Sequence, residues 1–392
     1  MTGKIVPVFI TSTVLLLNLS CGFQLLDYSL DTPATTLSVL GAPAVTDGRA
    51  RFRQIFCDRL AADPVFGTEQ GTTCDTYLLR LEDEAKPAVP AAPLPESVPR
   101  LRILIVPGFM GACYWDFAKP FEVSAARLNA RGYRIDWIVV DGRSGSEHNG
   151  GQIAEALRCL DLDEDEPLVL LGHSKGAVDI LDFLVSYPDL ARRVAAVVTV
   201  SGAINGTPLA DYLVNVYAAL GNLVAPGDCP PGDDRAVMSQ ERSVRLSWLA
   251  SHRLPDWVQY FSVVSLTQGG NVNTILREGY DLLKAIDPRN DGALLFYDEV
   301  IPGGTLLGYA NADHWATAYP LEEKHPTLTK TFFLHNHYPR TALLEAIALY
   351  VAEALKTKGA NDGTPLSIRS GPAPEDPRLT PQEKIGRPPE GG

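Results

Sequence analysis

The stretch LVLLGHSKGA, residues 168–177, decides the fold of this chain. Its first four residues, Leu168–Leu171, form the short apolar run that is typical of a strand buried on both faces. Apolar residues then recur at helical spacing from Ala177 to Val185, before Pro188 ends the pattern. Between these elements lies a G-x-S-x-G pentapeptide, whose glycines avoid collisions between Cβ atoms and neighbouring backbone. The stretch predicts a strand, a sharp turn that presents the Ser174 hydroxyl above the sheet edge, and a helix.

Apolar strands alternate with helical segments on both sides of this stretch. The expected strands are Leu101–Val106, Tyr133–Val140, Leu168–Leu171, Val194–Val200, Tyr260–Leu266 and Thr305–Ala310. Helices are expected from the end of the first strand to Arg131, with Gly132 as the C-cap, and over Gln152–Leu160 and Leu343–Leu355. Because a crossover between parallel strands must return over the sheet, this order predicts an α/β fold, a mostly parallel sheet with helices on both faces.

The overall composition is that of a soluble globular protein, with 45% apolar and 21% charged residues. Its 392 residues exceed the usual size of one domain and leave room for appendages to a large core. The net charge of −13 and the lack of any Lys/Arg-rich run argue against nucleic acid as a partner.

The first residues resemble an export signal. Lys4 precedes an apolar run, Ile5–Leu17, that is too short to span a bilayer and has the length of a signal-peptide core. We therefore expect residues 1–21 to direct export, although a buried N-terminal helix or strand is the alternative. Cys21 after this run resembles the lipidated cysteine of bacterial lipoproteins, but Asn18 stands where such signals usually carry an aliphatic residue. The expected location is periplasmic, membrane-anchored through a lipid, or secreted.

Changes in composition divide the rest of the chain. Residues 22–83 form an N-terminal arm and a small preface, in which Phe52, Ile55, Phe56 and Leu60 fall at helical spacing. Residues 84–99 are a Pro/Ala-rich linker, which cannot continue a helix or a central strand. Residues 100–356 carry the strand and helix alternation, and residues 357–392 have the composition of a disordered tail.

The six cysteines fit an oxidising compartment. Cys57 and Cys74 flank a short polar loop and form the favoured disulfide. If Cys21 is removed or lipidated, five cysteines remain, so at least one of the last three is free; these are Cys113, Cys159 and Cys229.

Several motifs in order resemble the α/β-hydrolases, especially bacterial lipases and esterases, over about residues 100–356. Besides the G-x-S-x-G turn, Pro107-Gly108-Phe109-Met110-Gly111 at the end of the first core strand resembles the oxyanion loop of that family. The resemblance implies that the backbone N–H groups of Phe109 and Lys175 stabilise an oxyanion. We expect the Lys175 side chain itself to be solvated, so that its amide and not its amine is useful. Many lipases have His before the glycine; Pro107 leaves the backbone donors in place. An ordinary Pro-Gly turn is the alternative.

The same resemblance implies a catalytic triad with Ser174 as nucleophile. The family carries its base in the loop after the last strand, where this chain has His314 within Asn311–Trp315. Its acid matches Asp291, because Asn290-Asp291-Gly292 resembles the segment that holds the catalytic Asp of bacterial lipases. Other candidates stay open: His325, His335 and His337 for the base, and Asp287, Asp298 and Asp313 for the acid.

A segment of about residues 205–257 interrupts the alternation of strands and helices. Ser201–Asp211 resembles the stretch that leads into the lid of lipases, and a helix is expected from Leu209 to Leu220. This helix would cover the acyl pocket as a lid. The alternative is an ordinary helix that packs on the core.

Together these features predict an exported serine hydrolase that cleaves carboxylic esters of small molecules or lipids through an acyl-enzyme, without cofactor or metal. The fold and triad do not fix the substrate, so a thioesterase, an acyltransferase or a peptidase is an alternative. From another class, a catalytically silent binding protein on this fold is the second alternative. The natural substrate and the oligomeric state stay open.

Overall fold

The computed structural model describes residues 44–362 except 70–72, 82, 87–92, 94–96, 162, 164–165, 213–228, 230–231 and 332; in the last helix, the side chains of 360–362 are not described. The expected signal segment with Cys21 and the tail after residue 362 lie outside the described residues. So do parts of the expected linker and of the expected lid, including the lid helix beyond Tyr212.

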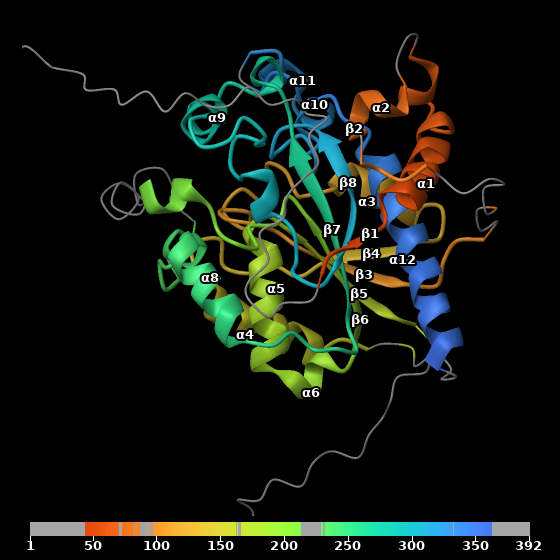
Figure 1. The fold of residues 1–392 in the computed structure, drawn as a ribbon, viewed down its shortest axis with the longest axis vertical. Coiled ribbons are helices and arrows are strands. Elements are labelled where there is room, and N and C mark those ends of the chain that lie inside the picture. The colour runs from red at the N-terminus through yellow and green to blue at the C-terminus, as the bar shows by residue number, and fades with distance from the viewer. Residues whose placement is uncertain are drawn as a thin grey trace, which may run out of the picture.

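One sheet of eight strands forms the centre of the described chain, in the order β1-β8-β7-β6-β5-β3-β4, with β2 pairing beside this path (Figure 1). The strands are β1 (Thr46–Asp47), β2 (Leu78–Leu79), β3 (Arg102–Val106), β4 (Arg134–Trp137), β5 (Leu168–His173), β6 (Val194–Val200), β7 (Gln259–Leu266) and β8 (Thr305–Asn311). Every neighbouring pair is parallel except β2 and β8. The expected α/β fold with a mostly parallel sheet is confirmed.

Helices cover both faces of this sheet (Figure 1). The described α-helices are α1 (Arg49–Ala61), α2 (Cys74–Tyr77), α3 (Glu122–Asn129), α4 (Ser146–Arg158), α5 (Lys175–Ser186), α6 (Pro188–Ala191), α8 (Arg242–Ser251), α9 (Arg277–Lys284), α10 (Leu321–Lys324), α11 (Pro326–Thr329) and α12 (Arg340–Asp362). Short 3₁₀ turns are η1 (Phe66–Thr68), η2 (Met238–Gln240), η3 (Gly269–Asn271) and η4 (Phe296–Asp298).

The strands read as continuous apolar runs because each face of the sheet packs against its own helices. Ile103 and Ile105 of β3 belong to the core under α1, α3 and α12. Leu104 and Val106 point the other way and belong to the core under α4 and α5. This alternation, with both faces covered, produces the uninterrupted apolar strands of a parallel sheet.

The helix expected between the first strand and Arg131 is wrong over its first half. Turns follow β3, and α3 begins only at Glu122, after Pro120. Proline cannot supply the N–H that a continuing helix requires. In addition, the N–H of Met110 donates to the Gly142 carbonyl at 2.8 Å, a tertiary bond that replaces a helical one. Gly132, with φ +96°, follows shortly after the helix, as a left-handed residue near a helix end does.

The N-terminal preface, which comprises β1, α1, α2 and β2, is docked on the sheet rather than separate from it. Phe52, Ile55 and Phe56 of α1 are fully buried in the same core as α12. Both two-residue strands pair with β8 at the sheet edge. A disulfide joins Cys57 to Cys74, the pairing that the sequence favours.

A second disulfide joins Cys113 to Cys229, while Cys159 is free and exposed. The bond ties the loop after β3 to the chain just after the segment 213–228.

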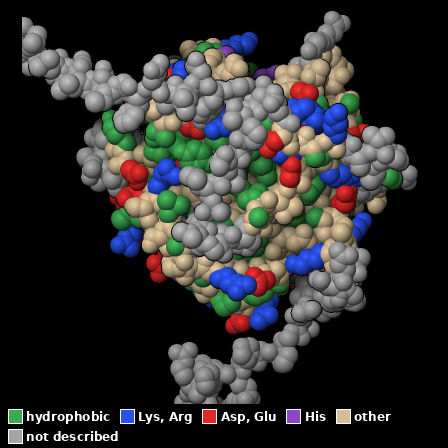
Figure 2. Space-filling model, viewed as in Figure 1, with side chains coloured by type: hydrophobic (Ala, Val, Ile, Leu, Met, Phe, Trp, Pro, Cys, Tyr) green, Lys and Arg blue, Asp and Glu red, His purple; other side chains and the backbone are tan. Residues whose placement is uncertain are grey.

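Over the face seen in Figure 2, side chains of both charge signs are interspersed among apolar ones. None of the helices in the described part of the chain has the length and hydropathy of a membrane span.

Candidate active site

Ser174 lies in a strained turn at the carboxyl end of β5. The strand ends at His173 and α5 begins at Lys175, so Ser174 alone makes the turn, with φ 55° and ψ −127°. A positive φ is costly for a residue with a Cβ and is kept mainly where function requires it. The flanking glycines are required sterically: a Cβ on Gly172 would strike the backbone of Ala177, and one on Gly176 would strike the carbonyl oxygens at the end of β3 and of Pro107 after it.

His314 lies within hydrogen-bond distance of this serine. It follows β8, whose carboxyl end lies at the same sheet edge as that of β5 because the strands are parallel. Its Nε2 is 2.9 Å from Ser174 Oγ, and its Nδ1 is 2.6 Å from Asp291 Oδ2. With Nδ1–H donating to the carboxylate, Nε2 is left to accept the serine proton. The structure thus brings together the three residues expected from the sequence.

The Asp291 carboxylate is held by its own turn. Gly292 adopts φ +92°, and its N–H donates to the Asn290 side chain at 3.0 Å. This turn aims the N–H groups of Ala293 and Leu294 at Asp291 Oδ1, at 2.8 and 2.7 Å. One oxygen is therefore fixed by backbone donors and the other is left to face the histidine. Asp291 is fully buried, so water does not compete for it.

The rival carboxylates are engaged elsewhere. Asp313 accepts from the N–H of Trp315 and Ala316 and from Asn273. Asp298 is paired with Arg242 at 3.1 Å, and Asp287 with Arg289; none of the three has a recorded bond to His314. Burial raises the pKa of Asp313 to about 6 and that of Asp298 to about 7.

The rival histidines also lie in other contacts. His325 bonds to a backbone carbonyl at 2.7 Å and stacks on Phe117. His337 lies between Glu69 of the preface and Glu322 of α10, and His335 is exposed. His173 contributes differently, because its Nε2–H donates to the His314 carbonyl at 3.0 Å. Burial, and then the neighbouring His314, lower the pKa of His173 to about 3, so it stays neutral.

The expected oxyanion loop lies directly against Ser174. A Cβ on Gly108 would lie 2.7 Å from the Ser174 Cβ, so only glycine allows this approach. Phe109 follows at once, which brings its backbone close to the serine. Lys175 is the first residue of α5, and the first N–H groups of a helix have no acceptor within it. The glycine before Phe109 and the start of α5 thus both adjoin the nucleophile.

The expectation of a solvated Lys175 side chain is wrong. Lys175 is 1% exposed, and its ammonium lies 2.6 Å from Asp179 Oδ1. An isolated buried ammonium is very costly, but a partner one helical turn later on the same face allows burial. Asp179 is equally buried, and burial raises the pKa of its carboxyl against the opposing effect of Lys175.

The described ends of the expected lid segment pack near the site. Residues 208–212 begin a helix, and Leu209 lies against Gly279 of α9. After the undescribed part, α8 packs on α5 through Arg245, which lies 3.7 Å from Asp182, and through Trp248, whose indole N–H donates to that carboxylate. The expectation that a helix over residues 209–220 covers an acyl pocket stays a prediction.

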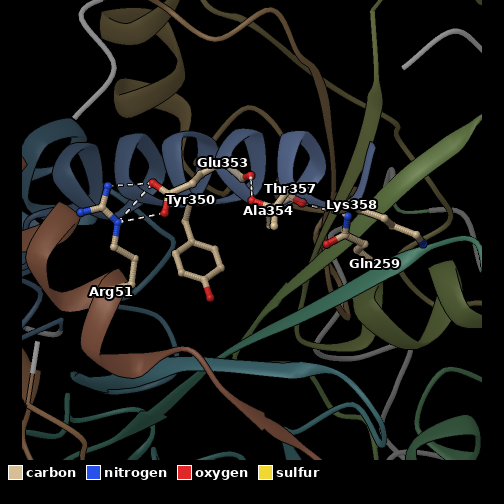
Figure 3. Close-up of a pocket in the computed structure, with 7 residues that line it drawn as sticks. All are labelled: Arg51, Gln259, Tyr350, Glu353, Ala354, Thr357 and Lys358. Atoms are coloured by element: carbon tan, nitrogen blue, oxygen red, sulfur yellow. Dashed lines mark hydrogen bonds and ion pairs between the residues drawn. The ribbon is translucent and has the colours of Figure 1, made fainter. Parts of the chain in front are cut away.

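A surface cavity of about 600 Å³ lies between α1, α12 and the start of β7 (Figure 3). It is at the amino end of β7, opposite the edge that carries Ser174. Its charged groups are engaged: Arg51 pairs with Glu353 at 2.7 Å, and Lys358 donates to the Trp257 carbonyl at 2.9 Å. This cavity is therefore not the site at which the serine would meet a substrate. Among the described residues, no cluster of His, Cys, Asp and Glu could hold a metal ion.

Comparison with solved structures finds similar proteins among esterases and lipases. A carboxyl esterase of metagenomic origin is 40% identical, with a TM-score of 0.74 over 82% of this chain and 97% of that one. A lipase from Bacillus licheniformis in its mature form is 22% identical, with a TM-score of 0.46 over 57% of this chain and 89% of that one. A lipase from Pelosinus fermentans is 12% identical, with a TM-score of 0.46 over 65% and 99%. No protein-family model and no curated protein matches the chain.

Proposed function

Because the chain belongs to the α/β-hydrolase esterases and lipases, we propose that it is an exported serine hydrolase that cleaves carboxylic esters through an acyl-enzyme. The observation that carries this proposal is the hydrogen-bonded line from Asp291 through His314 to Ser174, at 2.6 and 2.9 Å. The metagenomic relative is a carboxyl esterase, which supports an ester as the substrate class. The identity of the ester is left open by these features.

In the first half of the reaction, His314 Nε2 takes the Ser174 proton as Oγ attacks the ester carbonyl carbon. Asp291 stabilises the imidazolium that forms, and its contact with Nδ1 keeps the ring in the required tautomer. The negative charge that develops on the carbonyl oxygen is held by the backbone N–H groups of Phe109 and Lys175. Each such donor contributes about 3 kcal/mol to transition-state stabilisation.

The first half ends when this tetrahedral intermediate collapses: its bond to the alcohol oxygen breaks, His314 gives its proton to that oxygen, and Ser174 keeps the acyl group. In the second half, water is the nucleophile. The same nitrogen then accepts a proton from water as the water oxygen attacks the acyl carbon. Collapse of this second tetrahedral intermediate releases the acid and returns the proton to Ser174. The described residues perform each of these proton transfers by themselves.

Export is supported by two disulfides and by the first residues. The bonds Cys57–Cys74 and Cys113–Cys229 are characteristic of an oxidising compartment. Residues 1–21 have the composition of an export signal. Membrane attachment through a lipid on Cys21 is the further possibility within this proposal, and mass spectrometry of the mature N-terminus tests it.

The experiment is a substrate panel with purified wild type and Ser174→Ala. p-Nitrophenyl esters of increasing acyl length, matched thioesters, acyl acceptors and peptides are compared by kcat/KM. We expect ester hydrolysis in the wild type and a loss of at least about 10⁴-fold in kcat in the variant. Preference for thioesters, acyl transfer or peptides would assign the alternative activities. Ester hydrolysis retained by Ser174→Ala would overturn the proposal, and inactivity of the wild type on every substrate would favour a silent binding protein.

A further inference from the structure

The two expected oxyanion donors come from separate parts of the chain. Phe109 belongs to the loop after β3, and Lys175 begins α5 after β5. A pair of donors stabilises one oxygen only if both are held within about 0.5 Å of their working positions. Loops are the more mobile part of such an arrangement. Some contact must therefore keep the loop in register with the helix.

On the helix side, the first turn of α5 is fixed by the Lys175–Asp179 ion pair. The two side chains are each 1% exposed and span one turn of the helix that starts at the nucleophile. In such surroundings the attraction is not screened by water. The pair therefore links Lys175, which supplies one donor, to an equally buried residue four positions further along the helix.

Helix α4 extends this contact toward the other donor. Asn149, which is 1% exposed, donates from Nδ2 to Asp179 Oδ2 at 2.8 Å and to the Asp141 carbonyl at 3.1 Å. The close approach is possible because the next residue is Gly150, where a Cβ would lie 3.1 Å from the Phe183 nitrogen of α5. A single amide group thus bridges the buried carboxylate and the loop after β4.

That loop contacts the oxyanion loop directly. Gly142, which follows Asp141, accepts the Met110 N–H at 2.8 Å, and Met110 follows Phe109. The packing is tight, since a Cβ on Gly142 would lie 2.9 Å from the Met110 Cα. Asp141 is itself held by α4, because its N–H donates to the Gln152 side chain at 2.8 Å. The path from one donor to the other is therefore continuous.

We propose that Asn149, with the Lys175–Asp179 pair, is a positioning residue that holds the two oxyanion donors in register. The inference rests on the proposed function, because it concerns the same transition state. The Asn149 amide donates to Asp179 and to the Asp141 carbonyl rather than to Ser174, so it would act through the geometry of Phe109 and Lys175. A purely structural role would lower stability without a selective effect on the transition state.

The test uses Asn149→Leu, which keeps the approximate size of the side chain and removes its amide. Kinetics on a p-nitrophenyl ester are measured beside inhibition by a trifluoromethyl ketone of the same acyl length, whose tetrahedral adduct places an oxyanion between the two donors. We expect kcat to fall about 10- to 100-fold, less than the loss of a whole donor. KM should stay within about twofold, and the inhibition constant of the ketone should rise by the same factor as kcat falls.

Two further variants make the result decisive. Lys175→Met keeps the backbone N–H and breaks the network at its other end, so it should give the same pattern and replaces Asn149→Leu if that variant does not fold. Asn336→Leu is the control. Asn336 lies just before α12 and is 3% exposed, and its side-chain oxygen accepts the Glu322 N–H. This control should lose stability but keep kcat and the inhibition constant.

Wild type and Ser174→Ala are measured in the same series. If the wild type neither hydrolyses the ester nor binds the ketone, the proposed function fails and the inference fails with it. If the wild type does both, and folded Asn149→Leu and Lys175→Met match it in kcat and in ketone affinity, the inference alone is overturned. A rise in KM in both variants, with kcat unchanged, would also overturn the inference.

Discussion

The N-terminal preface and the Ser174 edge of the sheet bury different kinds of groups. In the preface, Phe52 and its neighbours on α1 fill a hydrophobic core, and the buried Arg53–Glu84 pair is completed by bonds from Arg53 to the Leu78 and Leu79 carbonyls. At the Ser174 edge, polar groups are buried in a line that ends on a serine with positive φ. Both regions pair their buried polar groups, but the Ser174 edge also keeps a residue with a Cβ at positive φ, a strain that is retained mainly where function requires it. We therefore expect the first region to serve stability and the second to serve chemistry.

The largest expected effect distinguishes Asp291 from Asp313, two buried carboxylates at the sheet edge that carries Ser174. Asp291→Asn should lower kcat about 10⁴-fold, because an amide cannot hold His314 in the required tautomer. Asp313→Asn is the matched control, since Asp313 is equally buried but bonds to Asn273 and backbone N–H groups. It should lower the melting temperature and reduce kcat at most about tenfold. If Asp313→Asn proves the more damaging to kcat, the acid is misassigned.

The opposite result is expected in the preface. Phe52→Ala removes a fully buried ring that packs on Phe56 and Tyr350, and should cost about 3–5 kcal/mol of unfolding free energy. Its kcat per folded molecule should equal that of the wild type, because the docked helix lies away from Ser174. Urea unfolding and kinetics on the same sample check both points. A loss of kcat without a loss of stability would show that the two regions are not separate.

The smallest effect concerns His337, which links the preface to the rest of the fold. Burial opposes its charge, but hydrogen bonds to Glu69 and Glu322 raise the pKa of His337 above the usual 6.5. A raised pKa favours the charged form on folding, so this stability is complete below pH 6.5 and is lost as pH rises through the folded-state pKa. The side chain is 45% exposed, so the contribution is at most about 1 kcal/mol.

Urea unfolding of wild type and His337→Gln at pH 5.5 and pH 9 measures this contribution. The wild type should be the more stable at pH 5.5, with the difference shrinking at pH 9. A difference that grows with pH would contradict the assignment, and a change in kcat would link this contact to the active edge.

The sequence was sufficient for the central sheet, and the three residues that it proposed as a triad, Ser174, Asp291 and His314, lie within hydrogen-bond distance of one another along one line. Buried parallel strands are continuous apolar runs, which can be recognised in the sequence without knowledge of the neighbouring strand. The expected strand Val194–Val200 matches β6 residue for residue. Strands β1 and β2 have two residues each, too few for any periodic pattern. Their position is set by pairing with β8, which is distant in the sequence, so no local pattern encodes it.

The burial of the Lys175 side chain was not predicted from the sequence, although its ionic partner Asp179 lies only four residues further along the same helix. Lys175 was expected in solvent because a lysine beside a turn usually is, whereas its burial depends on Asp179 and on Asn149 of another helix. Two signals were available: the i,i+4 spacing of Lys175 and Asp179 on the expected helix, and the Asn149-Gly150-Gly151 segment inside α4. Glycine weakens a helix, so two in succession indicate a close approach of another element.

The central claim, that Ser174 is the nucleophile, is tested most directly by covalent labelling. Wild-type protein is treated with a fluorophosphonate probe and digested with trypsin, and the labelled peptide is sequenced by mass spectrometry. Trypsin releases residues 159–175, a peptide in which Ser174 is the sole serine. We predict one label per chain on this peptide, none on Ser174→Ala, and much slower labelling of His314→Ala. Ester hydrolysis by a protein that carries no label on Ser174, or carries it on another peptide, would contradict the account.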